Sequence, residues 1–120
     1  MREILFRGKD LQTGEWAFGD LIQFENGPVI RYGSGGEKTA FAVHPQTVGQ
    51  YTGLNNQDGI KLFEGDIIQW NNKRAWIAYL PDRAAFAAMY HDLHNLIPPL
   101  DTVRYEIIGN IHDNPELMEE

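Results

Sequence analysis

Alternation of apolar and polar side chains is the feature that most constrains the fold of this chain. Between residues 15 and 25 the even positions carry Trp16, Phe18, Ile22 and Phe24, and only Asp20 interrupts them. The odd positions of the same run are polar or small apart from Leu21. A period of two places successive side chains on opposite faces of a β-strand, whereas a helix repeats every ~3.6 residues. We therefore expect a strand here, with its aromatic face in the core.

A second alternating run covers residues 103–111 and predicts another long strand. Its expected core side carries Val103, Tyr105, Ile107 and Ile111, and its expected solvent side carries Arg104, Glu106 and Asn110. Shorter apolar runs separated by glycine, asparagine and proline add further strands, about seven to nine in all. The expected fold class is mainly β: a compact small barrel or a rolled antiparallel sheet of short strands.

Three further expectations concern local structure. Residues 66–70 and 74–79 read as a tight hairpin whose second arm is an interior strand, because that arm is apolar on both faces. Residues 82–90 have the alanine content of a helix but also suit a strand, and we favour the strand because sequential strands usually pair. At the end of the chain, Asn114 as N-cap and Pro115 as first helical residue predict a short C-terminal helical turn. No linker divides the chain, so we expect one domain over residues 1–120.

Composition limits the chemistry. The 120 residues are 42% apolar and 12% aromatic, and they contain no cysteine. These values favour a folded core and exclude disulfides, thiolate metal sites and cysteine nucleophiles. The net charge is −7, but the last eight residues hold four acidic side chains and no basic one, so the rest carries only −3. No signal-peptide core or apolar run of ~18 residues is present, and we expect a cytoplasmic protein without a membrane partner.

Metal, cofactor and phosphate sites are not expected. His91 and His94 have a spacing that suits one metal ion on a helical turn, but no third ligand is evident, and two loop histidines explain the pair. The glycine-rich run at residues 33–36 lacks the lysine of a phosphate-binding loop and has no helix after it.

Catalytic and nucleic-acid functions remain as alternatives. His112 with Asp113, or Glu64 with Asp66, has the side chains for general acid–base work, although turns explain both pairs and no nucleophile is evident. In the second pair, Gly65 suits a turn conformation that a side chain resists, and Asp66 is expected to accept backbone hydrogen bonds. Stacking of nucleic-acid bases would use aromatic side chains with sparse cations nearby. The candidates are Trp16, Trp70, Trp76, Tyr32, Tyr51, Tyr79 and Tyr90, with Arg2, Arg7, Lys9, Lys73 and Arg74.

Three groups of stretches are recognisable together: residues 2–8 with 14–16, residues 47–54 with 58–59 and 63–68, and residues 107–117. They resemble the YopX-like family of phage and prophage proteins, whereas residues 73–101 do not contribute to the resemblance. The signature positions are Gly49, Tyr51, Thr52, Gly53, Leu54, Gly59, Glu64, Gly65, Asp66, Gly109, Asn110, His112, Asn114 and Pro115. The resemblance implies a mainly β, barrel-like, self-associating domain from a phage or prophage, with no established biochemical activity and no catalytic residue to transfer.

The sequence thus predicts a non-enzymatic accessory protein, without a cofactor, that oligomerises or binds a phage or host protein. A nucleic-acid-binding small barrel is the first alternative, and an enzyme using one of the two pairs above is the second.

Overall fold

The chain forms short antiparallel strands and no α-helix in the residues that the structure describes. The structure is a computed structural model that describes residues 2–33, 39–90, 93–96 and 104–119, the third of these ranges by its backbone alone. In these ranges lie eleven strands and two 3-10 turns. They are β1 (Phe6–Lys9), β2 (Trp16–Phe24), β3 (Gly27–Tyr32), β4 (Thr39–Ala42), η1 (Pro45–Thr47), β5 (Gly49–Asn55), β6 (Lys61–Phe63), β7 (Asp66–Trp70), β8 (Lys73–Leu80), β9 (Ala85–Tyr90), β10 (Leu93–Leu96), β11 (Glu106–Asn110) and η2 (Pro115–Met118).

The strands form two sheets, with orders β4-β3-β2-β1-β5-β6 and β10-β9-β8-β7-β11. The mainly β prediction is therefore confirmed, although the described strands outnumber the seven to nine expected. Neither sheet closes into a barrel within the described ranges, so the rolled antiparallel sheet is the better of the two predicted forms. The chain divides into two compact units, residues 1–51 and 52–120. That residues 1–120 fold as one domain stays a prediction.

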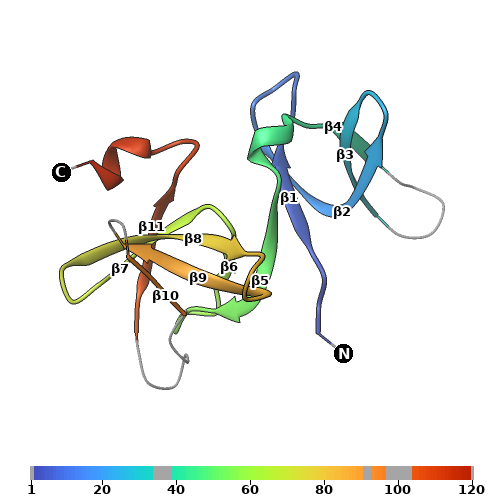
Figure 1. The fold of residues 1–120 in the computed structure, drawn as a ribbon. Coiled ribbons are helices and arrows are strands. Elements are labelled where there is room, and N and C mark those ends of the chain that lie inside the picture. Colours follow the sequence, from blue (N-terminus) through green and yellow to red (C-terminus); the bar gives the residue numbers. More distant parts are fainter. Residues whose placement is uncertain (1, 34–38, 91–92, 97–103, 120) are drawn as a thin grey trace. The chain divides into compact units, whose positions relative to one another are not determined.

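The first unit is a curved sheet built on a long β2–β3 hairpin (Figure 1). β1 pairs with β2 on one side, β4 pairs with β3 on the other, and the start of β5 pairs with β1. Residues just beyond β1 and β4 meet in an isolated bridge between Asp10 and Val43, which rolls the sheet. The core of this unit is small and centres on the buried side chains of Ala17, Ile30 and Val43.

The prediction that the aromatic face of β2 lies in the core is wrong. Ala17 is buried, whereas Phe18 and Phe24 on the predicted core face are 45% and 56% exposed. The reason lies in the neighbouring strand: Ala17 is opposite Gly8, and a Cβ at Gly8 would lie 2.9 Å from a Val43 methyl group. This face of the sheet accommodates only small side chains there, so the aromatic side chains of β2 project from the opposite face.

The second unit contains the larger core. Leu62, Ile68, Ala75, Ile77 and Tyr105 are among its buried side chains, and partly buried aromatic rings pack around them. The hairpin of β7 and β8 is confirmed, and β8 is the central strand of the five-stranded sheet, as its two apolar faces predict. The preference for a strand within residues 82–90 is also confirmed, since β9 pairs with β8 from Ala85 to Met89.

The alternation predicted for residues 103–111 holds only in part. Tyr105 is buried and Ile107 packs against the core, but Asn110, expected on the solvent side, is only 9% exposed. The register between β11 and β7 shifts between Ile107 and Gly109. Over this step β11 contains one residue more than β7. This bulge changes the phase of the strand, because an extra residue exchanges the two faces beyond it.

The C-terminal helical turn is confirmed as η2, which follows β11 in Figure 1. Pro115 occupies its first turn as expected, but Asn114 does not cap it through its side chain. Instead, Asn114 Oδ1 accepts a hydrogen bond of 3.3 Å from the backbone N–H of Asn110. The side chain therefore stabilises the link between β11 and the turn.

The assignment of faces in the first unit can be tested by stability. Ile30 is fully buried, so Ile30→Ala should lower the free energy of unfolding by about 2–4 kcal/mol through lost apolar contacts and a residual cavity. Phe18→Ser should lower it by at most about 1 kcal/mol, because much of that ring already contacts water. Urea denaturation followed by circular dichroism measures both values. A loss for Phe18→Ser as large as that for Ile30→Ala would place the aromatic face in the core.

Candidate functional site

A groove with aromatic walls lies in the first unit. Its volume is about 460 Å³, and it lies where the start of β2 faces the end of β3 and β4. Its aromatic walls come from Trp16, Phe18, Tyr32 and Phe41. Tyr32 and Phe41 stack with ring centroids 5.7 Å apart and planes 14° apart, although Tyr32 is still 48% exposed. The groove therefore presents aromatic surface to solvent.

The polar side chains that line this groove are all hydrogen-bond acceptors or hydroxyls. Asp10 is buried and accepts a 2.8 Å hydrogen bond from the backbone N–H of Gln12. Thr13 Oγ1 accepts one of 3.1 Å from the N–H of Glu15, and Glu15 is exposed. Both bonds shape the loop between β1 and β2. This loop thereby places one exposed carboxylate beside the aromatic walls.

Two cations of β1 lie against Trp16. The Arg7 guanidinium carbon is 4.4 Å from a ring centroid of Trp16, and Lys9 Nζ is 5.6 Å from it. Strand pairing explains the arrangement, because Lys9 is directly opposite Trp16 and Arg7 is opposite Phe18. Neither cation lines the groove. Trp16 therefore shows that rings on this sheet attract positive charge, as expected from the negative face of an indole.

Charge is distributed unequally between the units. Residues 1–51 hold 5 basic and 6 acidic side chains, a net charge of −1, and residues 52–120 hold 5 and 11, a net charge of −6. Large exposed apolar side chains follow the opposite distribution. In the first unit they are Ile4, Leu11, Phe18, Phe24 and Tyr32, and in the second Ile60 and Tyr79. Among the side chains whose burial the structure describes, the nearly neutral unit thus carries more of the large exposed apolar ones.

The Glu64–Asp66 segment forms a turn in the second unit. Asp66 is only 3% exposed, and its Oδ2 accepts a hydrogen bond of 2.7 Å from the backbone N–H of Phe63. Gly65 has φ +94°, which glycine adopts without steric cost. Its N–H donates to Ile77 O at 2.7 Å, and its carbonyl accepts from Ile111 N at 2.9 Å. Both predictions for this turn, the glycine conformation and the backbone bond of Asp66, are confirmed.

The closing signature also forms backbone-supporting contacts. Asn110 Oδ1 accepts hydrogen bonds from the backbone N–H groups of His112 and Asp113 at 3.0 and 2.9 Å. Asn110 Nδ2 donates to Asp113 Oδ2 at 3.1 Å. A Cβ at Gly109 would lie 2.9 Å from Cγ of Asn114, so a side chain does not fit there without displacing the asparagine. His112 and Asp113 thus lie in a turn that Asn110 organises.

The signature positions between residues 49 and 59 also serve the backbone conformation. Thr52 Oγ1 donates to Leu62 O at 2.9 Å and accepts from Leu54 N at 3.1 Å. Tyr51 and Gly49 are buried on β5. Gly53 and Gly59 have φ +90° and +79°, where a side chain would add strain. The signature positions therefore form turns and strand ends, and strand pairing brings Asp66 of the central signature opposite Asn110 of the closing one.

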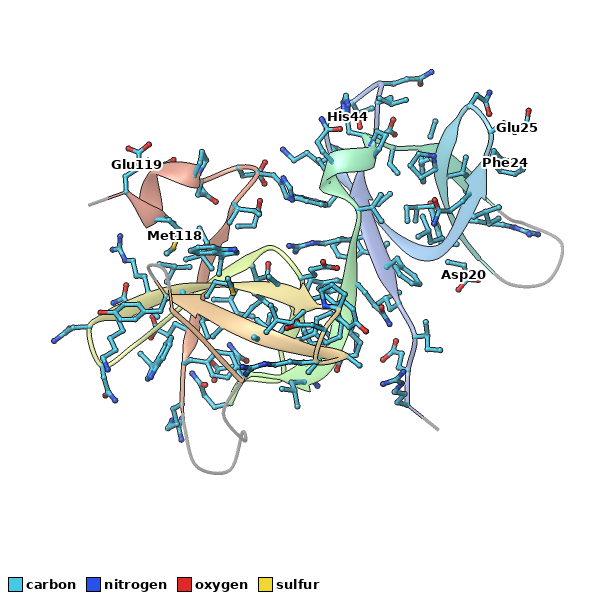
Figure 2. The ribbon with its side chains drawn as sticks, in the orientation of Figure 1. Asp20, Phe24, Glu25, His44, Met118 and Glu119 are labelled. Atoms are coloured by element: carbon cyan, nitrogen blue, oxygen red, sulfur yellow. The ribbon has the colours of Figure 1, made fainter. Side chains whose placement is uncertain are left out.

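A second groove of about 410 Å³ lies beside the C-terminal turn in the second unit. Arg74, Trp76 and Tyr90 contribute to it from the sheet, and Met118 and Glu119 contribute from the chain end labelled in Figure 2. Arg74 donates to Leu117 O at 3.2 Å and to Gln69 Oε1 at 3.0 Å. The guanidinium therefore holds the C-terminal turn against the sheet, which gives this cation a structural explanation.

Metal and membrane features can be described only for part of the chain. No group of three or more histidine, aspartate or glutamate side chains suited to a metal ion occurs among the described residues. His91 lies outside them, and of His94 only the backbone is described. None of the helical segments in the described ranges has the length and apolar character that crossing a membrane requires.

Comparison with known proteins identifies the family. The chain matches the YopX protein family over residues 5–119. It belongs to the YopX family. The predicted resemblance is thereby confirmed. The structure of this YopX family protein is also similar to the crystal structure of protein EF1440 from Enterococcus faecalis, with a TM-score of 0.61 and 25% sequence identity over 99% of this chain and 100% of that one. Comparison with curated proteins gives no significant match.

Sequence reasoning did not find the groove of this YopX family protein, because it assigned the alternating aromatic residues to the core. A usable signal was nevertheless present. Gly8 and Ala17 are small residues that lie opposite each other on β1 and β2, and a strand face made of small residues leaves the opposite face for the large rings. The pairing register needed to use this signal was not fixed by the sequence.

The structural explanation of Asp66 can be tested with a matched pair. Asp66→Ala leaves the buried N–H of Phe63 without this acceptor and should lower the free energy of unfolding by about 1–3 kcal/mol. Asp58→Ala removes an exposed carboxylate and should change it by less than about 0.5 kcal/mol. Thermal and urea denaturation give both values. Equal stability of the two variants would contradict the assignment.

Proposed function

We propose that this YopX family protein is a non-enzymatic accessory protein encoded by a phage or prophage, which acts in the bacterial cytoplasm by binding another protein chain. The binding surface is the groove of the first unit together with the exposed rings of Phe18 and Tyr32. The observation that carries the proposal is the concentration of exposed aromatic surface on the nearly neutral unit. The partner is a second copy of the chain or a phage or host protein.

Burial of this surface provides the driving force. Each Å² of apolar surface removed from water contributes about 25 cal/mol, and aromatic side chains dominate many protein interfaces. Phe18 and Tyr32 are about half exposed, so each can still lose a substantial apolar area on contact with a partner. The stacked Tyr32–Phe41 pair and the strand backbone hold this surface in place, which reduces the entropy lost on binding.

The enzyme alternative has less support. The Asp66 carboxylate is almost fully buried and already accepts a backbone hydrogen bond, so it is poorly placed to meet a substrate. Asp113 accepts a hydrogen bond from Asn110, and His112 lies in the turn that the same asparagine organises. Neither pair lines any of the described grooves discussed above.

The nucleic-acid alternative has one supporting feature, the stacking of Arg7 and Lys9 on Trp16. A binding groove for single strands combines stacking rings with cations that follow the phosphates. The groove of the first unit has the rings without lining cations, and the second unit carries a net charge of −6. Protein binding therefore explains the exposed aromatic surface better.

Light scattering coupled to size-exclusion chromatography tests self-association. If the partner is a second copy, the mass should rise from monomer to dimer as the protein concentration increases. The double variant Phe18→Ser/Tyr32→Ser should remain monomeric, because it lacks the exposed rings. Phe24→Ser should behave as the unsubstituted protein, since Phe24 is exposed at the end of β2 but does not line the groove (Figure 2).

A monomer at all concentrations rejects the second copy as partner. The tagged protein is then used for capture from phage-carrying cells, with the same variants in parallel. A protein retained by the unsubstituted chain and by Phe24→Ser, but lost with Phe18→Ser/Tyr32→Ser, supports the proposal. Capture that does not depend on Phe18 and Tyr32, or no capture at all, overturns it.

A further inference from the structure

We infer that the groove of the first unit binds a cationic side chain, arginine or lysine, of a partner protein. This inference rests on the proposed function and specifies the chemistry of the partner. The cation would lie against the exposed ring of Tyr32 and face the carboxylate of Glu15. The reasons are the size of the groove, the charge of its lining and the behaviour of the rings on the same sheet.

The groove is large enough for a side chain and its flanking backbone. Its volume of about 460 Å³ lies within the range of about 300–1,000 Å³ that is typical of ligand sites. Aromatic and small apolar side chains form most of its wall, which suits the methylene groups of an arginine or lysine. The occupant therefore needs an apolar stem as well as a charged end.

The charge of the lining selects a cation. Both charged side chains that line the groove, Asp10 and Glu15, are acidic. Asp10 is buried and receives a hydrogen bond from Gln12 N, so the exposed Glu15 is the carboxylate available to a bound ligand. An anion or phosphate would meet two acidic groups here and no lining cation. Electrostatic complementarity therefore favours arginine or lysine.

The rings provide the second attraction. Arg7 and Lys9 already lie over Trp16, so cation–aromatic contacts form on this sheet. Tyr32 keeps about half of its surface open, and stacking against Phe41 fixes the plane of its ring. A cation over an exposed ring gains a modest attraction, and arginine adds planar stacking.

Net charge distinguishes the occupant from a second copy. A basic partner is attracted to a chain with a net charge of −7 before contact, whereas a second copy of the same chain is not. The occupant is therefore a basic segment of a different protein. A second copy and a nucleic acid are alternative outcomes of the test below.

Two probes of equal shape provide the test. Nα-acetyl-arginine amide carries a guanidinium, whereas Nα-acetyl-citrulline amide carries a neutral urea in its place. The full-length protein is titrated with each probe, and NMR chemical shifts of the Trp16 indole and the Phe18 and Tyr32 rings are followed. We expect saturating shifts with the arginine probe, at about millimolar affinity for so small a ligand, and weaker binding of the citrulline probe.

Matched variants locate the site. Glu15→Gln and Tyr32→Leu should each weaken the arginine probe by about two- to fivefold, because one attraction is lost while the side-chain size is nearly kept. Glu25→Gln and Phe24→Leu change an exposed acid and an exposed ring at the β2–β3 turn, outside the groove (Figure 2), and should leave binding unchanged. Circular dichroism verifies that the variants fold.

Equal binding of the two probes, or absence of shifts in the groove rings, overturns the cation site. Equal losses for Glu25→Gln and Glu15→Gln also overturn it, since they indicate a diffuse charge effect. Shifts of the groove rings with a short oligothymidylate but not with the arginine probe would assign the groove to nucleic acid. If the cation site fails while partner capture or dimerisation still depends on Phe18 and Tyr32, the proposed function stands without it.

Discussion

The turn at Gly65 and Asp66 is the interaction on which the second unit depends. The Asp66 carboxylate receives the N–H of Phe63, and the peptide groups of Gly65 bond to Ile77 and Ile111. Two adjacent residues thus connect the turn between β6 and β7 with β8 and with the end of β11. The turn is buried, so water cannot replace these bonds if a side chain is changed. The conformation of Gly65, at φ +94°, permits this path of the backbone.

Local chemistry made part of the fold predictable. The Glu64–Asp66 turn, the β7–β8 hairpin and the C-terminal turn follow from residues near one another in the sequence, and the structure has all three. The burial of Ala17 and of Asn110 was not predicted, because it depends on pairing between strands that are far apart in the sequence. Ala17 is buried because Gly8 and Val43 lie across from it, and Asn110 turns inward because β11 gains a residue relative to β7. The local alternation of apolar and polar residues does not show which strand lies beside Ala17 or beside Asn110.

The same distinction applies to the candidate site. The signature positions that identify the family are glycines, turn formers and strand ends, and the side chains described here support backbone turns. The groove belongs to residues 10–41, where none of the signature positions lies, although the matching stretch at residues 14–16 contributes Glu15 and Trp16 to its lining. The signature positions therefore identify the scaffold rather than what the surface binds. The exposed faces of Phe18 and Tyr32 became evident only when strand pairing assigned each side chain to a face.

The bulge in β11 has a consequence for how the sequence of this protein can change during evolution. Ile108 is the additional residue between the pairs Ile107–Ile68 and Gly109–Ile67. Deleting that one residue would make the pairing regular and keep the pairs Ile107–Ile68, Gly109–Ile67 and Asn110–Asp66, so Asn110 would stay on the face of its partner. The Asn110 carboxamide could then still accept the N–H groups of His112 and Asp113. At this point the strand can lose a residue without exchanging its faces, so its length is less strictly constrained than its residue types.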